Sequence, residues 1–159
     1  MWHQYGVVPE EKDGLEVKKM KADDFRGMEA ELLMCTGARG LLVQNLWIEA
    51  GLMNGALGIV KGFMWPEDAD PQSEKIEQRT PLCVFMEFDS VNLICPDGQR
   101  RSFFPNDPEK LNWVPIFRQK VSSTIEENVV REQYPLTLAW ALTHWKAQGM
   151  TLDKVRVQL

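Results

Sequence analysis

The stretch at residues 134–153 constrains the fold most, because it reads as a single helix with a defined start and a defined stop. Pro135 suits the first helical turn, where a missing backbone N–H costs nothing. Apolar side chains then recur at helical spacing around most of the circumference, which predicts a helix buried between other layers. Gly149 ends this helix, since glycine readily adopts the left-handed C-cap conformation. Polar residues gather at that end and in the turn after it, namely Thr143, His144, Lys146, Gln148 and Thr151.

This stretch resembles motif V of the PIF-type (petite integration frequency) ATP-dependent DNA helicases, in the RecD-like branch of superfamily one. The positions that match the family pattern are Pro135, Leu136, Leu138, Ala139, Trp140, Ala141, Leu142, Thr143, Lys146, Gln148, Gly149, Thr151, Leu152 and Asp153. One departure concerns chemistry. The usual Ile-His pair reads His144-Trp145, so a tryptophan stands where the family has an imidazole.

A second block, at residues 37–60, extends the resemblance. The matching residues are Gly37, Ala38, Arg39, Leu42, Asn45, Leu46, Trp47, Gly51, Leu52, Asn54, Gly55, Gly58 and Val60. Gly40 stands where the family usually has an aliphatic residue. Taken alone, the Asn54-Gly55 pair is typical of any hairpin, and its place in this order favours the family.

The residues around this block predict short strands. We expect strands at 30–34 and 41–44, joined by a tight turn at 37–40. Asn54-Gly55 predicts a type I′ hairpin. A strand at 57–63 should follow, and its glycines should bend it strongly.

Further strands are predicted along the rest of the chain. An acidic surface loop at 65–80 separates the first strands from an apolar strand at 82–88. Asp97-Gly98 is a second hairpin signal. Strands are then expected at 113–118, where Pro115 should lie at an edge or bulge, and at 129–131. Short strands with turns between them suggest a small barrel.

The resemblance implies a domain order for these elements. We expect an α+β or partial α/β chain, in which an incomplete second RecA-like domain carries an inserted SH3-like β-barrel. The predicted parts are an exposed approach segment at 1–28, a RecA-like part at 29–55, the barrel at 56–133, and the motif V helix with a following strand at 134–159. The final alternation at 155–159 predicts a strand of a parallel sheet whose partners are not found in the sequence.

The motifs that bind and hydrolyse ATP in such a helicase are not found in this sequence. A phosphate-binding loop needs a Gly-Lys pair, and the magnesium-binding strand needs an Asp-Glu pair; neither dipeptide occurs. The family's final arginine motif is expected beyond Leu159. The full-length family uses ATP and Mg²⁺, and we expect neither to bind this chain alone. We therefore interpret the chain as the C-terminal portion of a 5′-to-3′ helicase whose N-terminal portion is missing, without ATPase activity of its own.

What remains would contact single-stranded DNA. The resemblance implies DNA-binding roles for Thr143, His144, Lys146, Gln148, Gly149, Thr151, Arg39 and Asn45. Hydroxyl, amide, ammonium and free backbone N–H groups are all suitable donors to phosphate oxygens. Alternatives stay open for several residues: His144 could be a half-buried helix histidine, Trp145 could pack in the core instead of stacking on a base, and Arg39 with Asn45 could stabilise a turn.

A second basic and aromatic group is also open to two interpretations. It comprises Arg100, Arg101, Arg118 and Lys120 beside Phe103, Phe104 and Phe117. Such a group suits a nucleic-acid face or a solvated strand edge. Charge favours the second half of the chain for phosphate contacts, since residues 1–98 carry a net charge of −8 and residues 99–159 a net charge of +3.

Composition limits the remaining classes. The net charge of −5 argues against a purely electrostatic nucleic-acid binder. Cys35, Cys83 and Cys95 lack metal-ligand spacing, so we predict reduced, buried thiols and a reducing, intracellular compartment. The resemblance to the helicase family implies the nucleus or the mitochondrion if the protein is eukaryotic. No signal peptide or membrane span is apparent. Hydrolase triads and buried carboxylate dyads are also not apparent. The alternatives to a helicase portion are a small-barrel module that binds nucleic acid or protein without ATP, and an inactive remnant.

Overall fold

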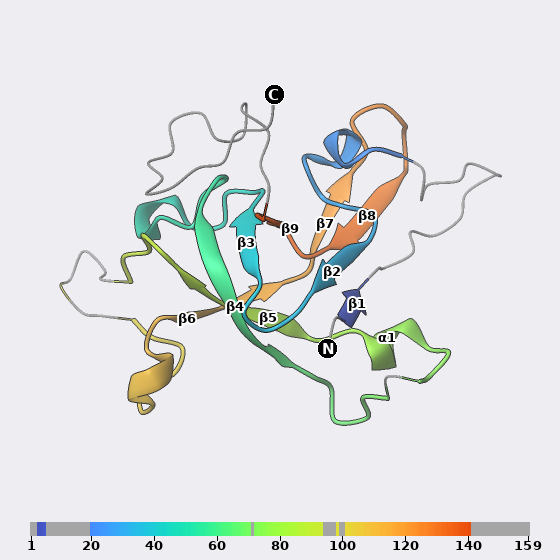
Figure 1. Cartoon of the computed structure of the whole chain (residues 1–159). Coiled ribbons are helices and arrows are strands. Elements are labelled where there is room, and N and C mark those ends of the chain that lie inside the picture. The colour runs from blue at the N-terminus through green and yellow to red at the C-terminus, as the bar shows by residue number, and fades with distance from the viewer. Residues whose placement is uncertain (1–2, 6–19, 71, 94–97, 99–100, 141–159) are drawn as a thin grey trace.

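The computed structural model describes residues 3–5, 20–70, 72–93, 98 and 101–140, and shows mostly β-structure with a few short helical turns (Figure 1). The strands are β1 (His3–Tyr5), β2 (Leu32–Met34), β3 (Arg39–Leu42), β4 (Leu57–Met64), β5 (Cys83–Phe88), β6 (Trp113–Phe117), β7 (Gln119–Ser122), β8 (Val130–Gln133) and β9 (Leu136–Leu138). The helical turns are η2 (Ala22–Phe25), η3 (Ile48–Ala50), α1 (Ile76–Arg79) and η4 (Pro108–Lys110).

Five of these strands form the main sheet, in the order β6-β5-β4-β3-β9, and all its neighbours are antiparallel. β1 pairs with β2, and β7 pairs with β8, in two smaller antiparallel sheets. Within the described residues, these sheets do not close into a barrel. The predicted SH3-like barrel is therefore not confirmed, and neither is the parallel sheet of an α/β fold.

Several predicted strands are confirmed, and β4 shows the predicted irregularity. Its register against β5 shifts between Val60 and Gly62, as a β-bulge requires. Pro115 lies on β6, which is an edge strand of the main sheet, where a missing N–H is tolerated.

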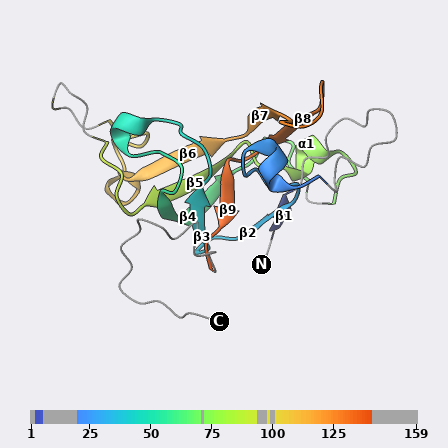
Figure 2. The same ribbon diagram turned by 90° about the horizontal axis from the view of Figure 1, so that it is seen from above.

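The predicted helix is wrong at its start, because Leu136–Leu138 form strand β9. β9 pairs with β3, and the two strands lie side by side in Figure 2. Leu136 lies opposite Leu42, and Leu138 lies opposite Gly40. Leu-Thr-Leu satisfies a strand period as well as a helix period, and the free edge of β3 decides between them. The remainder of the predicted helix, from residue 141, lies outside the described residues.

The predicted type I′ hairpin at Asn54-Gly55 is also wrong. A type I′ turn needs positive φ at both central residues. Gly55 has φ 96°, whereas Asn54 is not among the described residues with positive φ. Ala56 N–H donates to the Met53 carbonyl at 2.9 Å, so this is a local turn inside the long connection from β3 to β4.

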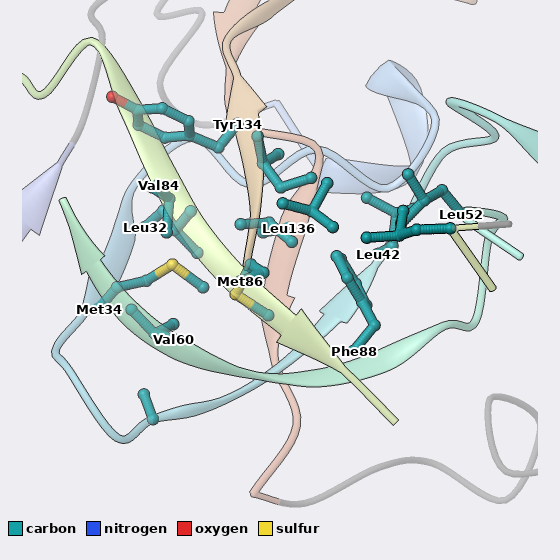
Figure 3. Packing of buried hydrophobic residues seen from close by; sticks show 14 residues of the cluster. Leu32, Met34, Leu42, Leu52, Val60, Val84, Met86, Phe88, Tyr134 and Leu136 are labelled. Atoms are coloured by element: carbon teal, nitrogen blue, oxygen red, sulfur yellow. The ribbon is translucent and has the colours of Figure 1, made fainter. Parts of the chain in front are cut away.

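The main core lies on one face of the main sheet and takes residues from β2 and from both ends of the sheet (Figure 3). Its buried members are Leu32, Met34, Ala38, Leu42, Leu52, Val60, Val84, Met86, Phe88, Leu93, Val114, Ile116, Tyr134 and Leu136. The buried Tyr134 hydroxyl donates to the Pro81 carbonyl, which satisfies its polar group inside this apolar cluster. The core thus joins residues of the predicted ranges 29–55, 56–133 and 134–159, whose boundaries remain predictions.

A second, smaller cluster lies beside the first and holds Phe25, Met28, Leu41, Val43, Val121 and Val129. Arg131 of β8 is fully buried next to it, with its guanidinium carbon 3.9 Å from the centre of the Phe25 ring. Its Nη1 donates to the Met28 carbonyl at 2.7 Å, and its Nη2 donates to the Met20 carbonyl at 3.1 Å. Arg131 therefore fastens the segment before β2 to the β7–β8 hairpin.

The cysteines agree only in part with the prediction of buried thiols. Cys83 is buried and free, as predicted. Cys35 is free but only half-buried. Cys95 lies outside the described residues.

Candidate nucleic-acid interface

Arg39 lies at the start of β3, on the face of the main sheet that points away from the main core. Its neighbour Gly40 faces the core, because a side chain there would meet Met86 Cε at 3.0 Å. Successive residues of a strand point to opposite faces, so Arg39 points outward. Its Nη1 donates to Asp89 Oδ1 at 2.8 Å and its Nη2 donates to Asp89 Oδ2, which makes a two-pronged ion pair.

This ion pair reaches across a whole strand. Arg39 lies opposite Ile59 of β4, whereas Asp89 directly follows β5, on the far side of β4. The Asp89 backbone is held independently, because its N–H donates to the Leu57 carbonyl at 2.9 Å. Both side chains stay partly exposed, at 32% for Arg39 and 41% for Asp89.

Arg39 also lies beside the end of β9. The Ala139 N–H donates to the Arg39 carbonyl at 2.9 Å. Two residues later the chain enters 141–159, which holds the six predicted DNA contacts Thr143, His144, Lys146, Gln148, Gly149 and Thr151. These six residues and Trp145 lie outside the described residues, so their DNA-binding roles stay predictions.

Asn45 lies near the opposite end of β3. Val43 N–H donates to the Pro135 carbonyl at that end, and Asn45 follows in the connection to β4. The Asn45 Oδ1 accepts a hydrogen bond from the Asn54 N–H at 2.8 Å, which braces this connection. The structure therefore does not bring Arg39 and Asn45 together, and it gives Asn45 a turn-stabilising contact.

The second basic and aromatic group is divided between different surroundings. Arg118 and Lys120 both lie beside Glu132, at 3.7 Å and 3.4 Å between the charged atoms. Phe104 packs edge-on against Phe85, with the ring centres 5.2 Å apart. Phe103 and Phe117 are half exposed, at 53% and 50%. Arg101 is exposed, and Arg100 lies outside the described residues.

Sequence reasoning missed the acidic partners of these cations. Lys61 pairs with Glu87 at 2.9 Å, on the same outward face as Arg39 and Asp89. These partners lie on other strands or directly after them, so no local spacing reveals them. The outward face is consequently a set of cation–carboxylate pairs and not a bare basic patch.

A second missed feature is the turn before β6. Asp107 caps η4, because its Oδ1 accepts from the Glu109 N–H at 3.1 Å. Its Oδ2 accepts from Lys110 Nζ at 2.6 Å, and that hydrogen bond holds the pKa of Asp107 below its ordinary value. Lys110 Nζ lies 5.5 Å from the centre of the Trp113 ring. The Asp-Pro start of this turn is a capping signal that the sequence does display.

The part of the chain that the structure describes holds no group of three or more His, Cys, Asp or Glu side chains that could bind a metal ion. It also has no helix with the length and apolarity needed to cross a membrane.

Comparison with known proteins identifies the segment. No protein-family model matches the sequence. The human ATP-dependent DNA helicase PIF1 is 33% identical over 123 residues, which are 77% of this chain and 14% of the human protein. The structure of Pif1 helicase from Candida albicans matches 97% of this chain and 32% of its own chain, with a TM-score of 0.61 and 23% identity. A Bacteroides Pif1 helicase, solved in complex with ADP-AlF3 and ssDNA, matches 96% of this chain and 27% of its own, with a TM-score of 0.50 and 22% identity.

The sequence match confirms the resemblance to the PIF-type helicases, and the structural match agrees with it at the level of the fold. The chain spans about one seventh of the length of the human protein, given the 14% coverage. The chain is therefore homologous to the PIF-type ATP-dependent DNA helicases and corresponds to one segment of them.

Proposed function

We propose that this chain supplies single-stranded DNA backbone contacts for a PIF-type, 5′-to-3′ ATP-dependent DNA helicase. The observation that supports it most directly is the pairing of β9 with β3. That pairing sets the outward-facing Arg39 beside Ala139, which lies inside the motif V resemblance. A planar guanidinium next to a segment that is expected to contact the DNA backbone is suited to binding a phosphate.

The relatives support a DNA partner at the level of the whole protein. The human relative is named an ATP-dependent DNA helicase, and the Bacteroides neighbour was solved with ssDNA and a nucleotide analogue. In such a helicase, ATP and Mg²⁺ would be held by the phosphate-binding loop and acidic pair that this sequence does not contain. We infer that this chain adds DNA contacts and motor coupling, and does not hydrolyse ATP alone.

The same proposal covers architecture and place in the cell. The β-sheets would be part of a second RecA-like domain with an SH3-like insertion, completed by the rest of the helicase. A eukaryotic protein of this kind would act in the nucleus or the mitochondrion, with roles in DNA repair, recombination and telomere maintenance.

The proposal is tested with the full chain and a fluorescent single-stranded oligonucleotide, by anisotropy across a salt series. Contacts to phosphates predict that log affinity falls with log salt, with a slope of about −0.7 per contacted phosphate. Lys146→Ala should weaken binding and reduce the slope, whereas Lys75→Ala in the 65–80 loop should not. A flat salt response, unchanged by Lys146→Ala, would remove phosphate contacts from the proposal. ATP turnover above background by the chain would contradict the inference that it does not hydrolyse ATP alone.

A further inference from the structure

The Arg39–Asp89 ion pair is not required to hold the two backbone segments in place. Arg39 is already fixed by its place opposite Ile59 and by the hydrogen bond from Ala139 to its carbonyl. Asp89 is already fixed by its N–H bond to Leu57. The two side chains can therefore part while both backbones stay in place.

The solvent exposure of the two side chains also indicates that the ion pair can be broken. About a third of the Arg39 side chain and two fifths of the Asp89 side chain are in contact with solvent, at 32% and 41%. An exposed ion pair is only weakly stabilising, because water and salt screen it. A ligand that offers a second anion can thus reach the guanidinium and compete for it.

The shape of the pair identifies the competitor. The Arg39 fork binds both carboxylate oxygens of Asp89. A phosphate presents two oxygens to the same fork in the same way. We propose that Asp89 is an internal competitor for phosphate, which occupies Arg39 in the free chain and is displaced when a single strand binds.

This inference rests on the proposed function, and adds that the affinity for a strand is held down by the protein's own carboxylate. It also has a consequence for salt dependence. When phosphate replaces Asp89, the freed carboxylate attracts a cation from solution, which offsets the cation released from the nucleic acid. Arg39 should therefore contribute little to the salt slope of the natural chain, and about one contact to that of a chain without the Asp89 charge.

The experiment compares four chains by anisotropy with a labelled oligothymidine, at several salt concentrations. Asp89→Asn keeps the shape and removes the competing charge. We expect it to bind about threefold more tightly near 0.1 M salt, with a slope steeper by about 0.7. Glu127→Gln changes the net charge equally at an exposed position in the turn between β7 and β8, and we expect no comparable gain. Arg39→Gln should weaken binding, and the double variant Arg39→Gln/Asp89→Asn should bind like Arg39→Gln.

The outcomes separate the two proposals. If Asp89→Asn gains no more than Glu127→Gln, or if its gain persists without Arg39, the competition is overturned while phosphate binding stands. If no chain binds the oligonucleotide, both proposals are overturned. Asp89→Ser is a second variant without the charge, to be used if thermal unfolding shows that Asp89→Asn does not fold. The same gain is expected from it, and its failure to bind more tightly would count equally against the competition.

Discussion

The two hydrophobic clusters are held together in different ways. The main core takes apolar side chains from β2 and from strands of the main sheet. The second cluster is smaller, and the segment that supplies Phe25 and Met28 is fastened by the buried guanidinium of Arg131. Burial lowers the pKa of Arg131, because loss of hydration disfavours its charged form.

The difference shows which interactions fix the position of a short segment in the fold. A strand gets its place from a repeating pattern of backbone pairs and alternating side chains. The segment at 20–28 has no such repeat, and a few hydrogen bonds fix it instead, from Arg131 to two of its carbonyl groups and from Thr124 to the Asp24 carbonyl. The first arrangement distributes its stability over many residues, whereas the second concentrates it in a few, among which Arg131 is fully buried.

The largest expected effect therefore comes from Arg131, which lies beside the second cluster. Arg131→Ala should lower the free energy of unfolding by about 4 kcal/mol, because it leaves buried carbonyls and nearby acidic groups uncompensated. Urea unfolding measures this. Arg118→Ala, which loses a long, partly exposed contact to Glu132, is the control, and should cost about 0.5 kcal/mol. Equal losses in the two variants would contradict the special role of Arg131.

The main core should lose less from a single substitution. Leu136→Ala should cost about 3 kcal/mol, because Leu136 is fully buried and the change leaves a cavity. Leu138 lies two positions along β9 and is only half-buried, so Leu138→Ala should cost about 1 kcal/mol. Chemical denaturation of both variants checks this order. The reverse order would show that β9 does not lie against the core as described.

A close approach inside the main sheet gives a smaller effect. A Cβ at Gly58 would lie 2.6 Å from the Glu87 carbonyl oxygen, so Gly58→Ala must push backbone apart and should cost about 2 kcal/mol. A Cβ at Gly62 would meet only the Trp113 ring, at 3.9 Å. Gly62→Ala should therefore stay within about 0.5 kcal/mol of the natural chain. Thermal or urea unfolding distinguishes the two, and similar values would count against the described register of β4.

The smallest effect depends on pH and tests whether the Cys83 thiol is buried away from water. Burial raises the pKa of the Cys83 thiol to about 11. Below an ordinary thiol pKa of about 8.5 both states keep the proton, so stability is unaffected. Above it the unfolded chain ionises first, and stability falls until the pH passes about 11.

At pH 9.5 the loss should be about 1 kcal/mol relative to pH 7.5. Cys83→Ala removes this titration and leaves the other groups unchanged. The difference in unfolding free energy between the natural chain and this variant should therefore shrink at the higher pH. A constant difference would mean that Cys83 is accessible to water.

Much of the sheet could be predicted from sequence, and the reasons are local. The apolar run at 82–88 and the edge position of Pro115 follow from composition and from the chemistry of proline. Residues 136–138 could not be assigned in this way. Their pattern fits two periods, and only the unpaired edge of β3 selects the strand.

The candidate site shows the same division. Arg39 was predicted as a phosphate contact from the family resemblance, but its partner Asp89 lies fifty positions away in sequence. Arg39 and Asn45 were predicted either to contact DNA together or to stabilise a turn; strand β3 separates them, and Asn45 braces the connection that follows it. Long-range partners of this kind depend on the fold as a whole and not on any local spacing.

The pairing of β3 with β9 has a consequence during synthesis. β3 is made early, and β9 is the last described strand to leave the ribosome. At typical elongation rates of about 5–20 residues per second, one edge of β3 waits for roughly five to twenty seconds without its partner. During that interval the nascent chain presents an open template to other polypeptides, so cellular yield should respond to chaperone supply more than the stability of the finished protein suggests.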